Sequence, residues 1–168
     1  AAAVGLLLGE TPELIAQGLV SYQASGMRQN IYEQDGYQIY ADCYNASPDA
    51  MEATLSVLGG MAGNGRRFAV LGSMLELGDY AEEGHRRAGR AAAQYADALY
   101  AYGPDAAAMV AGAREKGMEH AYAFDDQTAL VAALREDAKK GDALLFKGSR
   151  GMRMERALAM FLGEEVEA

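Results

Sequence analysis

Apolar residues recur along this chain with two spacings, one typical of strands and one typical of helices. Residues 67–72 form a short, mostly apolar run that ends in glycine, as a buried strand does. Met51, Leu55 and Leu58 recur instead at helical spacing, which indicates one buried helix face. The two patterns then alternate along the chain. Strands are expected at residues 98–103, 119–124 and 142–146, and helices at residues 81–96, 104–116, 126–138 and 152–162.

Strands that alternate with helices predict a parallel sheet, because a helical crossover returns the chain to the same edge. Two earlier strand-like segments, residues 28–33 and 37–42, flank Gln34-Asp35-Gly36, whose Asp-Gly pair favours a hairpin turn. We therefore expect an α/β, Rossmann-like three-layer domain. Its sheet should be mostly parallel, with helices on both faces and an antiparallel edge strand supplied by the hairpin.

The first 25 residues contain helical patterns only. Helices are expected at residues 1–8 and 12–22, with Thr11 as the cap of the second and Pro12 as its first residue. Ser25-Gly26 is the best linker candidate. The chain starts without methionine, inside what resembles the middle of a helix, so we expect it to be a piece of a longer protein.

Composition narrows the class of protein. Hydrophobic residues make up 51% and charged residues 23%, which is typical of a folded protein, and no apolar run is long enough to span a bilayer. The single cysteine, Cys43, forbids an internal disulfide and favours a reducing compartment, so we expect a cytoplasmic location. A net charge of −9 argues against nucleic acid and anionic membranes as partners.

Polar residues gather where two of the expected strands lead into helices, which is where α/β proteins bind ligands. Asp42 ends one strand, and Ser47 is a suitable N-cap for the helix that follows. The loop at residues 148–151 follows the last strand, and its backbone N–H groups could face an anion, although its spacing is not that of a Walker A motif. From the residues alone, an ordinary strand-to-helix turn explains the Asp42 segment better than a ligand site does, and it explains the loop at residues 148–151 equally well.

Five segments, in chain order, resemble the Mur ligase family, and within it the branch that adds D-alanyl-D-alanine to UDP-N-acetylmuramoyl-tripeptide. They are residues 26–28, 42–51, 70–78, 85–89 and 147–155. The resemblance implies that residues 26–168 are the carboxy-terminal Rossmann-like domain of such a ligase. It also implies that residues 1–25 are the tail of the central ATP-binding domain and the linker.

The resemblance implies an ATP-dependent amide ligase of peptidoglycan precursor synthesis, which acts through an acyl phosphate on the tripeptide. Its partners would be UDP-N-acetylmuramoyl-tripeptide, D-alanyl-D-alanine, ATP and its own amino-terminal and central domains. ATP and Mg²⁺ would be bound mainly by the central domain, which carries the family's phosphate loop and magnesium ligands. We therefore expect this chain alone to be inactive, with no catalytic and no metal-binding residue of its own.

The resemblance also implies two groups of binding residues. The nucleotide-binding group is Arg28, Asp42, Tyr44 and Asn45, and the substrate-binding group is Glu76, Lys147, Ser149 and Arg150. Arg28 would reach the nucleotide phosphates from the hinge when the domains close, because a guanidinium binds phosphate at two points. Asp42 would approach the ribose hydroxyls. Lys147, Ser149 and Arg150 would hold the terminal carboxylate of the dipeptide, and Glu76 would lie near the ligand crevice.

Three residues limit what the resemblance implies. Ser47 stands where the family has a second asparagine, and Ser73 where it has an aspartate, so the contacts of those side chains are expected to be missing. His85 matches a family histidine, yet a lone histidine near a helix start more often caps or packs than catalyses.

Two alternatives stay open. The chain could belong to a related ligase such as folylpolyglutamate synthase, against which the Tyr-Asn-Ala and Lys-Gly-Ser-Arg segments argue. It could also be a non-catalytic module that senses nucleotides or binds another protein through the same fold.

Overall fold

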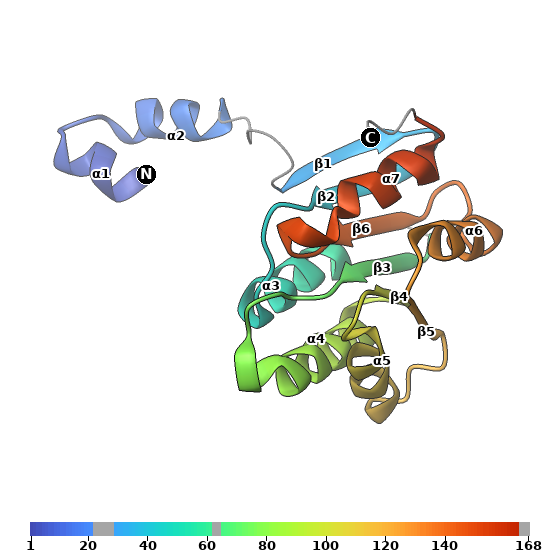
Figure 1. Cartoon of the computed structure of the whole chain (residues 1–168). Helices are drawn as coiled ribbons and strands as arrows, with labels where there is room; N and C mark the ends of the chain where they lie inside the picture. The colour runs from blue at the N-terminus through green and yellow to red at the C-terminus, as the bar shows by residue number, and fades with distance from the viewer. Residues whose placement is uncertain (22–28, 62–64, 165–168) are drawn as a thin grey trace.

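The computed structural model describes residues 1–21, 29–61 and 65–164, and within them it contains one sheet with the strand order β1-β2-β6-β3-β4-β5 (Figure 1). Only β1 and β2 pair in antiparallel fashion, so the edge hairpin and the mostly parallel sheet are confirmed. The strands are β1 Asn30–Gln34, β2 Tyr37–Asp42, β3 Arg67–Gly72, β4 Ala98–Tyr102, β5 Ala121–Phe124 and β6 Ala143–Lys147.

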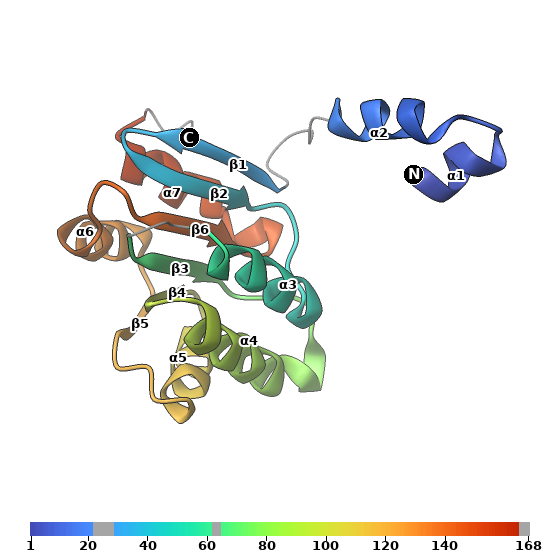
Figure 2. The ribbon, with the colours of Figure 1, turned by 180° about the vertical axis from the view of Figure 1, so that it is seen from behind.

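Helices cover both faces of this sheet, as the two opposite views show (Figures 1 and 2). Alternate residues of β3 divide the core, because Ala69 and Leu71 pack towards α3, α4 and α5, whereas Phe68 and Val70 pack towards α6 and α7. The expected three-layer architecture is therefore confirmed. The helices are α1 Ala2–Leu7, α2 Pro12–Val20, α3 Pro48–Gly59, α4 Ala81–Tyr95, α5 Ala106–Glu115, α6 Gln127–Asp137 and α7 Met154–Leu162.

The helix starts follow the capping pattern of the sequence. Ser47 accepts a hydrogen bond from the backbone N–H of Ala50 at 3.3 Å, and Pro48 is the first residue of α3. The last helix differs from expectation. It begins at Met154 because Arg150–Met152 form a 3₁₀ turn and Arg153 takes a left-handed conformation, with φ 48° and ψ 47°. The loop after β6 therefore does not lead directly into the helix.

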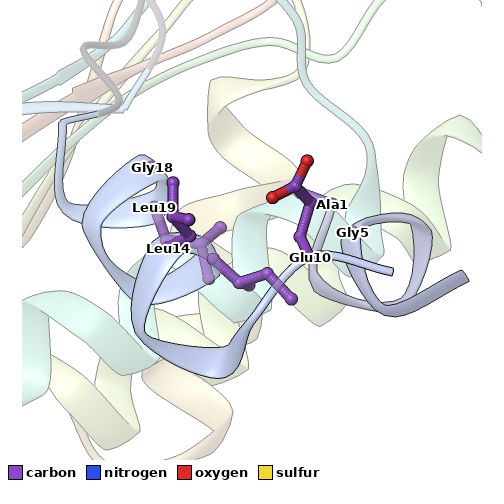
Figure 3. A pocket seen from close by; sticks show the side chains of 7 residues that line it. Ala1, Gly5, Glu10, Leu14, Gly18 and Leu19 are labelled. Atoms are coloured by element: carbon purple, nitrogen blue, oxygen red, sulfur yellow. The ribbon is translucent and has the colours of Figure 1, made fainter. Parts of the chain in front are cut away.

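The helices α1 and α2 form a separate hairpin with its own contacts. Gly5 lies so close to Ile15 that an added Cβ would come within 2.8 Å of its side chain. Much of the apolar surface of the two helices faces outwards, with Leu7 86% and Val20 87% exposed. Figure 3 shows the groove between them, which is lined by Ala1, Gly5, Glu10, Leu14, Ile15, Gly18 and Leu19. None of the helices in the described residues is long and apolar enough to cross a membrane.

Candidate functional site

The segments singled out in the sequence meet at the edge of the sheet where the parallel strands end. Asp42 is the last residue of β2 and Lys147 the last residue of β6, and the two are paired in the strand register. Ser73 follows β3, the other neighbour of β6. The carboxyl ends of parallel strands lie at one edge, so three segments far apart in sequence form one surface.

An ion pair joins the two predicted binding groups. The Lys147 ammonium donates to Asp42 Oδ2 at 2.5 Å and to the backbone oxygen of Asn45 at 2.8 Å. The Lys147 residue is 1% exposed and the Asp42 residue 8%. The second carboxylate oxygen, Oδ1, accepts from the backbone N–H of Gln29 at 3.3 Å. Asp42 and Lys147 therefore neutralise each other within the fold, and Lys147 does not belong to an exposed basic cluster.

The loop between β2 and α3 has one buried side chain, Cys43, followed by two exposed ones, Tyr44 and Asn45. Cys43 is fully buried, its thiol donates to the Phe146 carbonyl at 3.4 Å, and burial is the main reason that its pKa rises to about 12. Asn45 is exposed, with Oδ1 accepting from the N–H of Ala46 at 2.9 Å, and Tyr44 is 48% exposed. Arg28 lies outside the described residues.

Two serines connect the loops that follow β3, β4 and β6. Ser149 is 7% exposed; its hydroxyl accepts from the N–H of Leu75 at 2.9 Å, and its own N–H donates to the carbonyl of Ser73 at 3.2 Å. The Ser73 hydroxyl accepts from the N–H of Asp105, in the loop after β4, at 3.0 Å. Sequence reasoning treated Ser73 only as a missing carboxylate. Its small buried hydroxyl instead joins the loop after β3 to the loop after β4 by a hydrogen bond.

His85 holds the same loop from the α4 side. The fully buried imidazole accepts from the N–H of Met74 through Nε2 at 2.8 Å, and its Nδ1 donates to the carbonyl of Ala81 at 2.6 Å. These partners require the neutral tautomer with its proton on Nδ1. The structure therefore agrees with the interpretation of His85 as a packing and capping residue.

Glu76 and Arg150 are the members of the substrate-binding group whose charges face solvent. Glu76 has a left-handed backbone, with φ 68°, at the exposed turn that Ser149 and His85 support. The Arg150 side chain is 62% exposed and pairs with Glu155 Oε1, while Oε2 of Glu155 is buried without a hydrogen-bond partner. Sequence reasoning did not single out Glu155, although it ends the segment at residues 147–155. Lys147 and Ser149, in contrast, already have their polar atoms engaged.

The backbone of the loop after β6 is partly committed as well. The amides of Ser149, Met152 and Arg153 each donate to a carbonyl, namely those of Ser73, Ser149 and Arg150. These three N–H groups are not available to an anion. Among the described residues no cluster of three or more histidine, cysteine, aspartate or glutamate side chains is arranged to hold a metal ion. Among the described residues, the exposed groups at this edge include the Tyr44 ring, the Asn45 amide and the charges of Glu76 and Arg150.

The chain is similar in sequence to a known protein family and to several of its members. The family model described as "Mur ligase, glutamate ligase domain" matches residues 27–150. The UDP-N-acetylmuramoyl-tripeptide–D-alanyl-D-alanine ligase of Bacillus subtilis is 37% identical over 158 residues, which are 92% of this chain and 35% of that protein. The enzyme of the same name from Escherichia coli is 33% identical, over 94% of this chain and 34% of its own length.

Solved structures give the same result. The MurF ligase of Thermotoga maritima, crystallised with ADP, aligns with a TM-score of 0.81 and 33% identity over 96% of this chain and 36% of that one. A MurF structure from Acinetobacter baumannii aligns with a TM-score of 0.82 and 30% identity, over 96% of this chain and 35% of its own. A folylpolyglutamate synthase shares the fold at only 18% identity. The chain spans about a third of the length of its relatives, as the 35% and 36% coverages show. With a family model that matches most of its residues, the chain belongs to the Mur ligase family.

Proposed function

We propose that this chain is the carboxy-terminal part of a cytoplasmic, ATP-dependent ligase that adds D-alanyl-D-alanine to UDP-N-acetylmuramoyl-tripeptide. The observation that carries the proposal is that three segments that resemble the family meet at one edge of the sheet. Lys147 forms an ion pair with Asp42, and Ser149 accepts a hydrogen bond from the loop after β3. The identity to ligases of that name, 37% for the Bacillus subtilis protein, favours this branch over folylpolyglutamate synthase.

The α1–α2 hairpin supports the proposed domain division. Its outward-facing leucines and valines, with Leu8 76% and Val20 87% exposed, are costly to leave in water. We assign residues 1–25 to the end of a central ATP-binding domain and the linker, and residues 26–168 to the carboxy-terminal domain. The rest of the central domain would then cover the apolar groove of Figure 3.

On the nucleotide side, we assign Asp42, Tyr44 and Asn45 to one wall of the ATP site, with Arg28 reaching it from the linker. The residues fit a nucleotide because a carboxylate suits ribose hydroxyls and the half-exposed Tyr44 ring suits a flat base. We assign Mg²⁺ and the phosphate chemistry to the central domain, as the resemblance to the family implies. This chain would orient the nucleotide and exclude water.

On the dipeptide side, we assign Arg150 and Glu76 to direct contacts, and Ser149 to the support of the loop that carries Glu76. The exposed guanidinium of Arg150 suits the terminal carboxylate of D-alanyl-D-alanine, and the Glu76 carboxylate suits its amino end. The dipeptide amine would then attack the acyl phosphate of the tripeptide and release phosphate. The chain would contribute mainly positioning and charge complementarity to that step.

The reaction itself tests the proposal. The full-length protein should convert ATP, UDP-N-acetylmuramoyl-tripeptide and D-alanyl-D-alanine into the pentapeptide product, ADP and phosphate, and the 168-residue chain should form none. Product is measured by mass spectrometry and phosphate by a coupled assay. Glutamate addition to a folate instead would favour the folylpolyglutamate synthase alternative, and nucleotide binding without turnover would favour a sensing module. Turnover by the isolated chain would contradict the domain assignment.

Arg150→Ala in the full-length protein should raise the KM for D-alanyl-D-alanine by about tenfold to a hundredfold, because one charge-assisted hydrogen-bond pair is lost. The KM for ATP should stay within about twofold of the wild type. Arg114→Ala is the matched control, since Arg114 lies in the last turn of α5, away from the carboxyl edge. An unchanged dipeptide KM in Arg150→Ala would remove Arg150 from the proposed site.

A further inference from the structure

Lys147 is among the largest fully buried side chains in the described part of the chain, and its charge has a defined set of partners. It ends β6 beside Asp42, with which it is paired in the parallel register. Its ammonium donates to Asp42 Oδ2 at 2.5 Å and to the Asn45 carbonyl at 2.8 Å. A buried ammonium is tolerated only where such acceptors replace the lost water. Both acceptors belong to one loop, residues 42–47.

These contacts make Lys147 part of the loop between β2 and α3. The pair fixes Asp42 Oδ2, and therefore the orientation of the whole carboxylate at the strand end. The bond to the Asn45 carbonyl fixes the backbone directly after the exposed Asn45 side chain. The other carboxylate oxygen, Oδ1, points to the side from which residues after the linker approach, since it accepts from the N–H of Gln29 at 3.3 Å.

The same contacts separate Lys147 from the dipeptide side. To bind a carboxylate of a ligand, the ammonium would have to use its third N–H group, and the Lys147 residue is only 1% exposed, so a ligand could reach that group only if the surrounding structure opened. Arg150 has no such constraint, because its side chain is 62% exposed. Two cations close together in sequence are thus placed in different environments by the fold.

We propose that Lys147 is a positioning residue for the nucleotide, acting through Asp42 and the Asn45 backbone, and not a ligand of the dipeptide carboxylate. This inference rests on the proposed function, because it assigns Lys147 to one side of that ligase site. Lys147 holds Oδ2 so that Oδ1 of Asp42, which already accepts from the Gln29 N–H, presents its remaining lone pair to a ribose hydroxyl. Loss of the ammonium then changes ribose recognition and leaves dipeptide recognition intact.

The ribose hydroxyls provide the test. In the full-length protein, KM is measured for ATP, 2′-deoxy-ATP and 3′-deoxy-ATP, and separately for D-alanyl-D-alanine. The wild type should prefer ATP over at least one deoxy analogue by about tenfold, the value of one hydrogen bond to a charged group. Lys147→Met and Asp42→Asn should each reduce this preference to about twofold, and the double variant should reduce it no further. The dipeptide KM should stay within about twofold in all three.

Two further variants keep the outcome decisive. Arg150→Ala should show the opposite pattern, with a raised dipeptide KM and an unchanged ribose preference. Lys147→Gln keeps an uncharged N–H donor on a side chain that is one bond shorter, so it should be less destabilised than Lys147→Met, and its ribose preference should be intermediate.

Three results would overturn the inference. A Lys147→Gln or Lys147→Met enzyme with a raised dipeptide KM and the wild-type ribose preference would make Lys147 a dipeptide ligand. An enzyme with lower thermal stability but both recognition ratios unchanged would make its role purely structural. A wild-type enzyme that is active but shows no ribose preference would remove Asp42 from the ribose, whereas an inactive full-length protein would overturn the proposed function as well.

Discussion

Gly89→Ala is expected to destabilise the sheet domain by about 2–3 kcal/mol, the cost of overpacking a tight contact. Gly89 lies in the middle of α4, and an added Cβ would stand 1.8 Å from the Met109 carbonyl oxygen of α5. Gly112 makes the reciprocal contact, since its Cβ would stand 2.0 Å from the Arg86 carbonyl oxygen. The atoms in the way are backbone, so they cannot rotate aside and α5 has to move as a unit.

Gly89→Ala lowers stability only because of the contact with the Met109 carbonyl. Without that contact it would raise stability, because alanine favours a helix by about 1 kcal/mol over glycine. Gly60→Ala is the matched control: Gly60 follows α3 with φ −91°, and its added Cβ would make an ordinary contact of 3.5 Å with the Val57 oxygen. It should leave stability within about 0.5 kcal/mol of the wild type or raise it slightly. Urea unfolding followed by circular dichroism measures both. Equal stability of Gly89→Ala and the wild type would mean that α4 and α5 are not in backbone contact.

The fold was largely predictable because strands, helices and the hairpin turn each have a local sequence pattern. Alternation of apolar runs with helical periodicity in residues 98–162 identified the strands and helices in order, and Asp35-Gly36 identified the edge hairpin. The start of α7 was predicted two residues early. The left-handed conformation of Arg153 explains that error, and arginine carries no propensity that would announce it.

The order of strands within the sheet was not predictable in this way, and the site depends on it. Asp42 and Lys147 are 105 residues apart, and both were candidates because each lies in a segment that resembles the Mur ligase family. Only the insertion of β6 between β2 and β3 makes them neighbours and turns two presumed ligand-binding charges into a pair. The role of Ser73 was missed for a related reason: its hydroxyl accepts from a backbone amide, and backbone amides carry no sequence signal.

Lys147→Met is expected to destabilise the domain by about 3–5 kcal/mol, because removing one partner of a buried pair leaves the other charge uncompensated. Asp42 would keep only the 3.3 Å hydrogen bond from Gln29, and the Asn45 carbonyl would lose its donor. Methionine has a similar length and no charge, so little of the effect should come from lost volume. Urea unfolding of the 168-residue chain at neutral pH gives the change in free energy.

The double variant Asp42→Asn with Lys147→Met separates charge from packing. With both charges gone, no buried ion remains, so the double variant should regain about 2 kcal/mol or more relative to Lys147→Met alone. Lys116→Met, which removes an exposed lysine at the end of α5, is the control and should change stability by less than about 0.5 kcal/mol. A Lys147→Met chain as stable as the wild type at neutral pH would show that Asp42 finds water in place of the ammonium, and the pair would then be no fixed part of the site.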